Sequence, residues 1–125
     1  MSHARRSCLL FFVAALAIAQ EGHPLTGTWH GSWGPSATQR TDVTLVMKWD
    51  GKNVVGIINP GFDAMPLENA VLEPKGWMFH FEATAKDGKV VADGKIENVT
   101  NARRSITGKW TQGGRTGDFK VTRDN

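Results

Sequence analysis

Short runs of alternating apolar and polar residues follow one another along most of the chain. Residues 42–49 give the clearest case, because one face of an extended segment would carry Val43, Leu45, Met47 and Trp49. Alternation with a period of two is typical of β-strands that cover a core on one side only. The pattern predicts eight strands and no helix, and these strands cover residues 25–33, 42–49, 54–58, 67–72, 77–84, 90–97, 106–110 and 117–122.

Glycine-containing turns separate the predicted strands. Asp50-Gly51 and Asp87-Gly88 are typical hairpin turns, since both residue types tolerate the positive φ that tight hairpins need. Residues 34–40 and 112–114 are also rich in turn formers. Connections this short favour antiparallel neighbours, because a parallel crossover needs about a dozen residues or more. We therefore predict an all-β domain built as an antiparallel up-and-down eight-stranded barrel, with a two-sheet β-sandwich as the alternative.

Glycine and tryptophan recur together near both ends of this predicted sheet. Gly27-Thr28-Trp29 lies in the first strand, and Gly108-Lys109-Trp110 lies in the seventh. A glycine two residues before a tryptophan lies on the same face of a strand, so the indole can fold over the space that the glycine leaves. The two motifs suggest that both ends of the sheet fill one interior, and they give Gly27 and Gly108 a structural role.

The first of these motifs also carries a family resemblance. Gly27-Thr28-Trp29, with Arg123 at the end of the last predicted strand, resembles the signature of the calycin-like barrels, which include the lipocalins and their bacterial relatives. The resemblance implies that Trp29 closes the base of a barrel and that Arg123 packs across it through a cation–π contact. This chain is shorter than a typical lipocalin and lacks the usual disulfide of that family.

The chain also resembles two further groups of β-proteins. Residues 25–29 resemble the first strand of the avidin family, but the chain contains no tyrosine and offers no polar ring that would hold biotin. As a whole, the chain is similar to small secreted bacterial β-proteins whose last strand reads Gly-X-Phe-X-X-X-Arg, here residues 117–123.

Residues 1–19 have the features of an export signal. Arg5-Arg6 precedes an almost wholly apolar run over residues 8–18, and residues 17–19 give the Ala-x-Ala pattern of a cleavage site. The apolar run is shorter than the roughly 20 residues that span a bilayer. We therefore predict a signal peptide over residues 1–19, a single domain over 20–125, a periplasmic or extracellular location, and no membrane span.

Loss of this leader changes both the charge and the cysteine content. The whole chain carries 15 Lys and Arg against 12 Asp and Glu, but Arg5 and Arg6 belong to the leader. The remaining domain is close to neutral, which gives no reason to expect a nucleic-acid partner. Cys8 is the single cysteine of the chain, so the mature domain has neither a disulfide nor a thiol nucleophile.

Residues suited to catalysis or metal binding do not gather in the sequence. His30 and His80 lie within predicted strands but on their outward faces, and no HxH or Cys/His spacing is present for a metal. The chain has no Gly-x-Ser-x-Gly motif and no glycine-rich loop that opens a helix. We predict no metal, no cofactor and no enzymatic activity.

Large aromatic residues on the inward faces are the strongest functional signal. They can simply pack the core, or they can line a pocket for a small apolar or planar ligand. For that pocket, Asn69 is predicted to share the inward face as an orienting polar group. The candidate ligand-binding residues are Trp49, Phe62, Met65, Asn69, Trp77, Phe79, Phe81 and Trp110.

The segment of residues 59–66 is the best candidate for contact with another molecule. It holds Phe62 and Met65 between two prolines, where apolar side chains have no evident core duty. Phe62 either belongs to a lid or binding tip, or it plugs an open end of the barrel. Trp33, at the end of the first predicted strand, is a second candidate of this kind.

Two functions remain open from the sequence. The first is a secreted binding protein that holds its ligand inside the aromatic barrel. The alternative is a protein-interaction module with a filled core, similar to the small periplasmic barrels that inhibit secreted proteases, which would act through its loops and residues 20–24. An internal cavity of roughly 300–1,000 Å³ would favour the first function.

Overall fold

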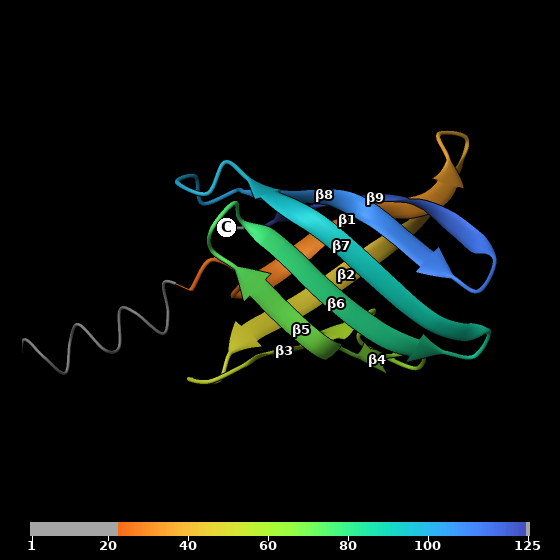
Figure 1. Cartoon of the computed structure of the whole chain (residues 1–125), viewed down its shortest axis with the longest axis horizontal. Coiled ribbons are helices and arrows are strands. Elements are labelled where there is room, and N and C mark those ends of the chain that lie inside the picture. Colours follow the sequence, from red (N-terminus) through yellow and green to blue (C-terminus); the bar gives the residue numbers. More distant parts are fainter. Residues whose placement is uncertain (1–22, 125) are drawn as a thin grey trace, which may run out of the picture.

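The computed structural model describes residues 23–124 and confirms an all-β chain (Figure 1). A single antiparallel sheet contains all of the strands. Their bounds are β1 Gly27–Ser36, β2 Gln39–Trp49, β3 Val54–Ile58, β4 Met65–Pro66, β5 Glu68–Glu73, β6 Met78–Ala85, β7 Gly88–Glu97, β8 Ser105–Gln112 and β9 Arg115–Arg123.

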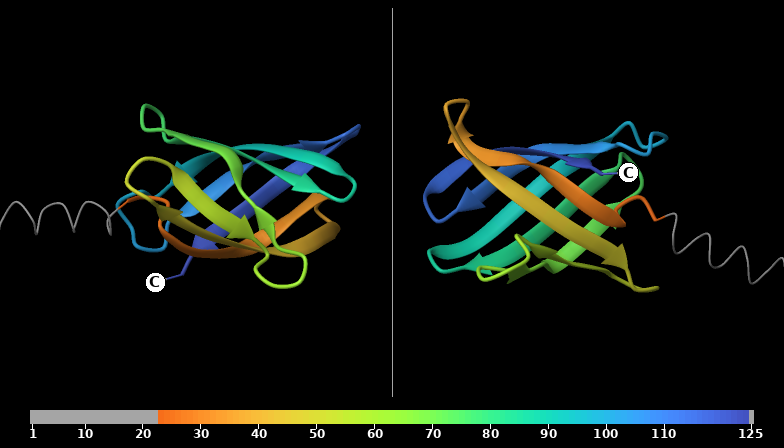
Figure 2. Two further views of the ribbon diagram at one scale, coloured as in Figure 1. Left: turned by 90° about the horizontal axis from the view of Figure 1, so that it is seen from below. Right: turned by 180° about the vertical axis from the view of Figure 1, so that it is seen from behind.

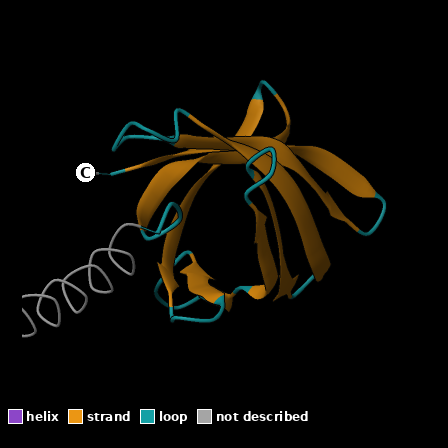
Figure 3. Cartoon of the chain, turned by 60° about the vertical axis from the view of Figure 1, so that its left-hand side comes forward, coloured by secondary structure: helices purple, strands orange, loops and turns teal. Residues whose placement is uncertain are grey.

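The sheet curls into a nearly closed barrel (Figures 2 and 3). β1 pairs with both β2 and β9, so the first and last strands of the barrel lie side by side. The strand order is β4-β3-β2-β1-β9-β8-β7-β6-β5, which leaves β4 and β5 as the two edges. We call the line where these edges meet the seam; there the Leu67 amide donates to the Gly56 carbonyl oxygen over 2.9 Å.

The barrel has two distinct ends, the base and the open end. The base contains Trp29, the segment 23–26 that leads into β1, and the connections at residues 50–53, 74–77 and 98–104. The open end contains the connections at residues 37–38, 59–64, 86–87 and 113–114. In Figure 1 the base is on the left and the open end is on the right.

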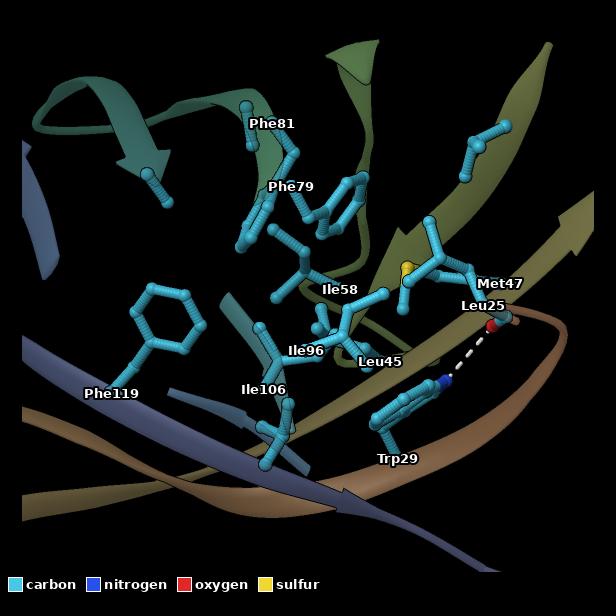
Figure 4. Close-up of a cluster of buried hydrophobic side chains, with 14 of the residues drawn as sticks. Leu25, Trp29, Leu45, Met47, Ile58, Phe79, Phe81, Ile96, Ile106 and Phe119 are labelled. Atoms are coloured by element: carbon cyan, nitrogen blue, oxygen red, sulfur yellow. Dashed lines mark hydrogen bonds between the residues drawn. The ribbon is translucent and has the colours of Figure 1, made fainter. Parts of the chain in front are cut away.

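The predicted alternation is confirmed in the strands that form the wall. In β6, for example, Phe79, Phe81 and Ala83 are buried while the residues between them face outward. The side chains in Figure 4 accordingly converge from several strands on one interior. The buried core consists of Leu25, Trp29, Leu45, Met47, Val54, Ile58, Phe79, Phe81, Ala83, Ala92, Ile96, Ile106, Trp110, Phe119 and Val121.

Several predicted boundaries were wrong. Residues 34–40 were expected to form a turn, but β1 continues to Ser36 and β2 starts at Gln39. A break in the β1–β2 register between Trp33 and Ser36 accommodates Pro35, which has no amide hydrogen for the ladder. The short strand β4 adds a ninth strand in a segment that was expected to be irregular, where it pairs with β3.

Trp29 closes the base of the barrel, as the resemblance implied. Its side chain is fully buried, and its indole Nε1 donates to the Leu25 carbonyl oxygen over 2.9 Å (Figure 4). Leu25 is itself fully buried, so the segment before β1 folds across the base and covers the core. A tryptophan whose polar atom is bonded can be buried without an unpaired donor.

Arg123 also lies at the base, but the predicted cation–π contact with Trp29 is not formed. Although Arg123 is the register partner of Trp29, its Nε donates to the Ala102 carbonyl oxygen (2.8 Å) and its Nη1 to that of Thr26 (3.1 Å). These bonds direct the guanidinium to the backbone. Its stem covers Gly27, where an added Cβ would lie 3.1 Å from Arg123 Cδ.

Gly108 has a different structural role, in the wall of the barrel. It is the register partner of Gly94, and a Cβ added to Gly108 would lie 2.5 Å from the Gly94 Cα. Glycine is therefore needed for the close approach of β7 and β8 rather than for the fold of an indole over an empty space.

The predicted signal peptide, residues 1–19, and most of the segment 20–24 lie outside the described residues. Within residues 23–124, no helix has the length and apolar character needed to cross a membrane.

Candidate functional site

A cavity of about 650 Å³ lies at the open end of the barrel. Residues from β1, β2, β3, β4, β6, β7, β8 and β9 line it, together with the connections 59–64 and 86–87. Its apolar walls are formed by Trp33, Val43, Leu45, Ile58, Met65, Phe81, Val90, Ala92, Trp110 and Phe119. The interior is therefore packed at the base and hollow at the open end.

Two edge-to-face aromatic pairs shape the walls. The rings of Trp33 and Trp110 are 4.8 Å apart at an interplanar angle of 79°. The rings of Phe81 and Phe119 are 5.7 Å apart at 76°. Such pairs are favourable beyond the area that they bury, by about 0.5–1.5 kcal/mol each. Because each pair joins two different strands, the walls of the cavity are held in a defined arrangement.

Local sequence explains the position of the Trp110 ring. Gly117 on β9 is the register partner of Trp110, and a Cβ there would lie 2.8 Å from the Trp110 Cζ2. The indole Nε1 donates to the Asp118 carbonyl oxygen over 3.0 Å, which fixes the ring against β9. The Arg115 guanidinium lies over the ring at 5.9 Å from its centroid, a cation–π contact.

Gln112 is the one buried polar side chain among residues 23–124. It lines the cavity, has 8% of its surface exposed, and donates from Nε2 to the Gly88 carbonyl oxygen over 3.3 Å. The adjacent glycines Gly113 and Gly114 predict a turn at this position, so Gln112 was not among the predicted site residues. Extending the inward positions Ile106, Gly108 and Trp110 by one further step of two would have identified it.

Charged groups of both signs surround the mouth of the cavity. Asp63, Lys86, Asp87 and Arg115 contribute to its lining. Within the described part of the chain, none of the four takes part in an ion pair. With two cations and two anions, the mouth provides no strong net field to attract a ligand of one charge.

The predicted ligand-binding residues do not all gather in this cavity. Met65, Phe81 and Trp110 line it. Phe79 instead belongs to the core, with 1% of its surface exposed, and stacks on Phe81 at 5.1 Å. Trp49 lines a second hollow of about 290 Å³ near the base. There its ring stacks on His23 at 4.8 Å, and burial lowers the pKa of that histidine.

Phe62 does not plug the open end. Its side chain is fully exposed, with a relative exposure of 102%, and it lies outside the lining of the cavity. The prediction that it has no core duty is confirmed, whereas the suggestion of a plug is wrong. The connection 59–64 contributes Asn59, Asp63 and Ala64 to the cavity instead.

Asn69 and Trp77 also differ from their predicted orientations. Asn69 faces outward and donates from Nδ2 to Glu82 Oε1 over 3.1 Å. The register of β5 with β6 is irregular between Glu68 and Val71, and this irregularity, with a φ of 48° at Asn69, reverses the expected face. Trp77 has a φ of 55° and precedes β6; it packs against the core but lines neither cavity.

A polar network occupies the outer face of β6 and β7, away from the cavity. His80 contacts Glu82 through Nε2 (2.6 Å) and Asp93 through Nδ1 (2.7 Å), and these hydrogen bonds raise the pKa of His80. Lys89 lies 2.8 Å from Glu82 and, together with His80, lowers the pKa of that carboxyl to about 2. The outward orientation predicted for His80 is confirmed.

The remaining histidine of the strands also faces solvent, where His30 Nδ1 lies 2.8 Å from Asp124 Oδ2. Across residues 23–124, no group of three or more His, Cys, Asp or Glu side chains is arranged to hold a metal ion.

Comparison with protein-family models, with curated proteins and with solved structures gave no match for this chain. The nearly closed antiparallel barrel is compatible with a calycin-like fold. The resemblance to that group therefore rests on the architecture and on the motif around Trp29.

Proposed function

We propose that this protein binds a small apolar or planar ligand in the aromatic cavity at the open end of the barrel, without catalysing a reaction on it. The cavity volume of about 650 Å³ carries the proposal. Sites for small molecules have volumes of roughly 300–1,000 Å³ and are lined mainly by apolar and aromatic side chains. A solid interior would instead have favoured a module that acts only through its loops.

The lining supports this choice of ligand. Trp33, Phe81, Trp110 and Phe119 offer flat apolar surfaces that are already held by their mutual contacts. A pocket whose walls need no rearrangement loses little conformational entropy when a ligand enters. The balanced charges at the mouth favour a ligand with no large net charge.

We also propose that the protein acts after export, in the periplasm or outside the cell, as a distant relative of the calycin-like barrels. The export proposal is supported by the leader over residues 1–19, and the relationship is supported by Gly27, Trp29 and Arg123, which meet at the base.

Native mass spectrometry of protein purified from an exporting host tests the binding function directly. We expect an additional mass of a few hundred daltons, lost on denaturation. Titration with 2-naphthol, followed by calorimetry, tests the same cavity without knowledge of the natural ligand. The absence of both a co-purified ligand and 2-naphthol binding would contradict the proposal.

A pair of variants locates the binding site. Ala85 lines the cavity, so Ala85→Trp should fill the mouth and weaken 2-naphthol binding at least tenfold. Ala102 is exposed in the connection 98–104 at the base, so Ala102→Trp is the matched control and should bind as the unmodified protein does. Equal effects of both substitutions would show that 2-naphthol binds outside the cavity.

One observation favours a second candidate function, contact with a protein partner. Phe62 is a large apolar side chain with complete exposure, placed on a connection that is free of the core. Exposed aromatic residues are frequent anchors of protein interfaces. In that case Phe62 would insert into a partner while the cavity served a separate ligand or none.

A further inference from the structure

Gln112 breaks the apolar pattern of the barrel interior. The inward face of β8 carries Ile106, Gly108 and Trp110, and the next inward position is Gln112, with only 8% of its surface exposed. A polar residue at a core position destabilises a fold unless its hydrogen bonds are made. Departures of this kind from the packing rules tend to mark functional positions.

The carboxamide of Gln112 has hydrogen-bonding capacity that the protein leaves unused. A glutamine side chain offers two amide hydrogens and one acceptor oxygen. Within residues 23–124 its only hydrogen bond runs from Nε2 to the Gly88 carbonyl oxygen over 3.3 Å, which is long for an N–H···O contact. Oε1 receives no donor from the described residues.

Oε1 is nevertheless not fully enclosed by protein atoms. Among the described residues, the one side-chain polar atom that is fully buried without a partner is Thr26 Oγ1, far away at the base. Gln112 lines the cavity and is otherwise buried, so its carboxamide lies next to this space. An acceptor oxygen is therefore presented to whatever occupies this space.

The surroundings of Gln112 fix the kind of group that it would recognise. Its register partners are Val90, which is apolar and lines the cavity, and Arg115, whose guanidinium lies over the Trp110 ring. Oε1 thus provides a neutral acceptor in a cavity that is also lined by the aromatic rings described above. A neutral acceptor in an apolar site strengthens the binding of a ligand that donates an N–H or O–H. It does not strengthen the binding of a pure hydrocarbon.

We propose that Gln112 is the specificity-determining residue of the cavity, and that the ligand is a planar, largely apolar molecule with one N–H or O–H group that donates to Gln112 Oε1. This inference rests on the proposed function, because it requires that the cavity bind a ligand. The inference adds the chemical class of that ligand and the protein atom that accepts its hydrogen bond.

Two probes that differ by a single hydroxyl group test the inference. Calorimetry gives the Kd of 2-naphthol and of naphthalene for the unmodified protein and for Gln112→Met, which keeps the side-chain length but removes the acceptor. A hydrogen bond contributes about 0.5–1.5 kcal/mol net, so the preference for 2-naphthol over naphthalene should fall by a factor of roughly 2 to 13 in the variant. Gln39 is exposed at the start of β2, and Gln39→Met, as the matched control, should leave the preference unchanged.

A spectroscopic measurement adds a result that a purely structural role would not produce. The side-chain amide resonances of Gln112 should shift on addition of 2-naphthol by clearly more than on addition of naphthalene. Thermal unfolding first establishes whether Gln112→Met is folded. If it is not, Gln112→Leu takes its place in both measurements.

The possible results separate this inference from the proposed function. If neither probe binds the unmodified protein, the inference about Gln112 is overturned, and the proposed function is overturned with it if no ligand co-purifies. If both probes bind but the preference is the same in Gln112→Met, the cavity remains a binding site and the role of Gln112 is overturned. A reduced preference in Gln112→Met, with no change in Gln39→Met, supports both.

Discussion

The two ends of the barrel are built from the same strands yet have opposite interiors. β1 carries Trp29 and Trp33 on its inward face. At the base, Trp29 is fully buried, and its indole donates to the Leu25 carbonyl oxygen. At the open end, Trp33 is only partly buried and lies edge-on against Trp110, beside the cavity.

This difference shows that an end is filled or hollow according to what covers it. Leu25, from the segment before β1, folds over the base, whereas the open end has only tight hairpins and the connection 59–64, whose Phe62 points into solvent. Stability should therefore depend mainly on the base, and ligand binding on the open end. The predictions below test this division.

The largest effect is expected for Trp29→Ala. Loss of a fully buried tryptophan costs about 3–5 kcal/mol in the free energy of unfolding, and urea denaturation measures it. Trp33→Ala is the matched change at the open end and should cost clearly less, because that ring already faces a cavity. Equal losses at the two positions would contradict the division between the ends.

Arg123→Ala should come next, with a loss of about 2 kcal/mol in the free energy of unfolding. It leaves the carbonyl oxygens of Thr26 and Ala102 without their charged donor. Arg115→Ala, at the open end, removes a cation–π contact and should cost less than about 1 kcal/mol. Urea denaturation measures both losses. A larger loss for Arg115→Ala than for Arg123→Ala would contradict the conclusion that stability depends mainly on the base.

A smaller effect is expected from pH, through the network on the outer face. Because Glu82 and Asp93 raise the pKa of His80 above its ordinary 6.5, the protonated ring stabilises the folded state below that value. This stabilisation is lost as the pH rises through the raised pKa. The urea midpoint should therefore fall from about pH 6 to about pH 9, and less so in His80→Gln, with His30→Gln as the control.

Glu82 acts in the opposite direction at low pH. Its pKa of about 2 lies below the ordinary 4.5, so its stabilisation of the folded state is present above pH 4.5 and is lost as the pH falls towards 2.

Since the network faces away from the cavity, His80→Gln should leave the Kd of 2-naphthol unchanged. A changed Kd would show that the network on the outer face influences ligand binding in the cavity.

The smallest change in stability is expected for Phe62→Ser. A fully exposed side chain contributes little to stability, so the free energy of unfolding should change by no more than about 0.5 kcal/mol. Thermal unfolding of the variant measures this change. Its affinity for 2-naphthol should also stay the same, because Phe62 lies outside the cavity lining. Weaker 2-naphthol binding would mean that the connection 59–64 closes over the cavity in solution.

Most of the wall could be predicted from the sequence, because each strand there faces the core on one side only. Alternation alone placed Phe81 and Phe119 inward. The seam could not be predicted, because β4 contains only Met65 and Pro66, too few residues to show an alternating pattern. The predicted orientation of Asn69 was wrong for a different reason: one irregular step in a strand turns the following side chains to the other face.

The site was less accessible to prediction than the fold. Aromatic residues on inward faces indicated Trp110 and Phe81, but the same pattern also indicated Trp49 and Phe79, which lie elsewhere. Alternation is identical at both ends of a barrel, so it does not reveal which end is covered. Gln112 was not predicted because the adjacent Gly113 and Gly114 indicate a turn, so the strand was expected to end before residue 112.

The pairing of β1 with β9 has a consequence for the timing of folding. These two strands join almost the first and the last described residues, and β9 supplies Phe119 and Val121 to the core. Contacts so distant in sequence form only after a large loss of chain entropy, and they form late. The barrel therefore cannot close until its final strand has been made and released. If the chain is exported unfolded after its synthesis, this delay would keep it in a transportable state.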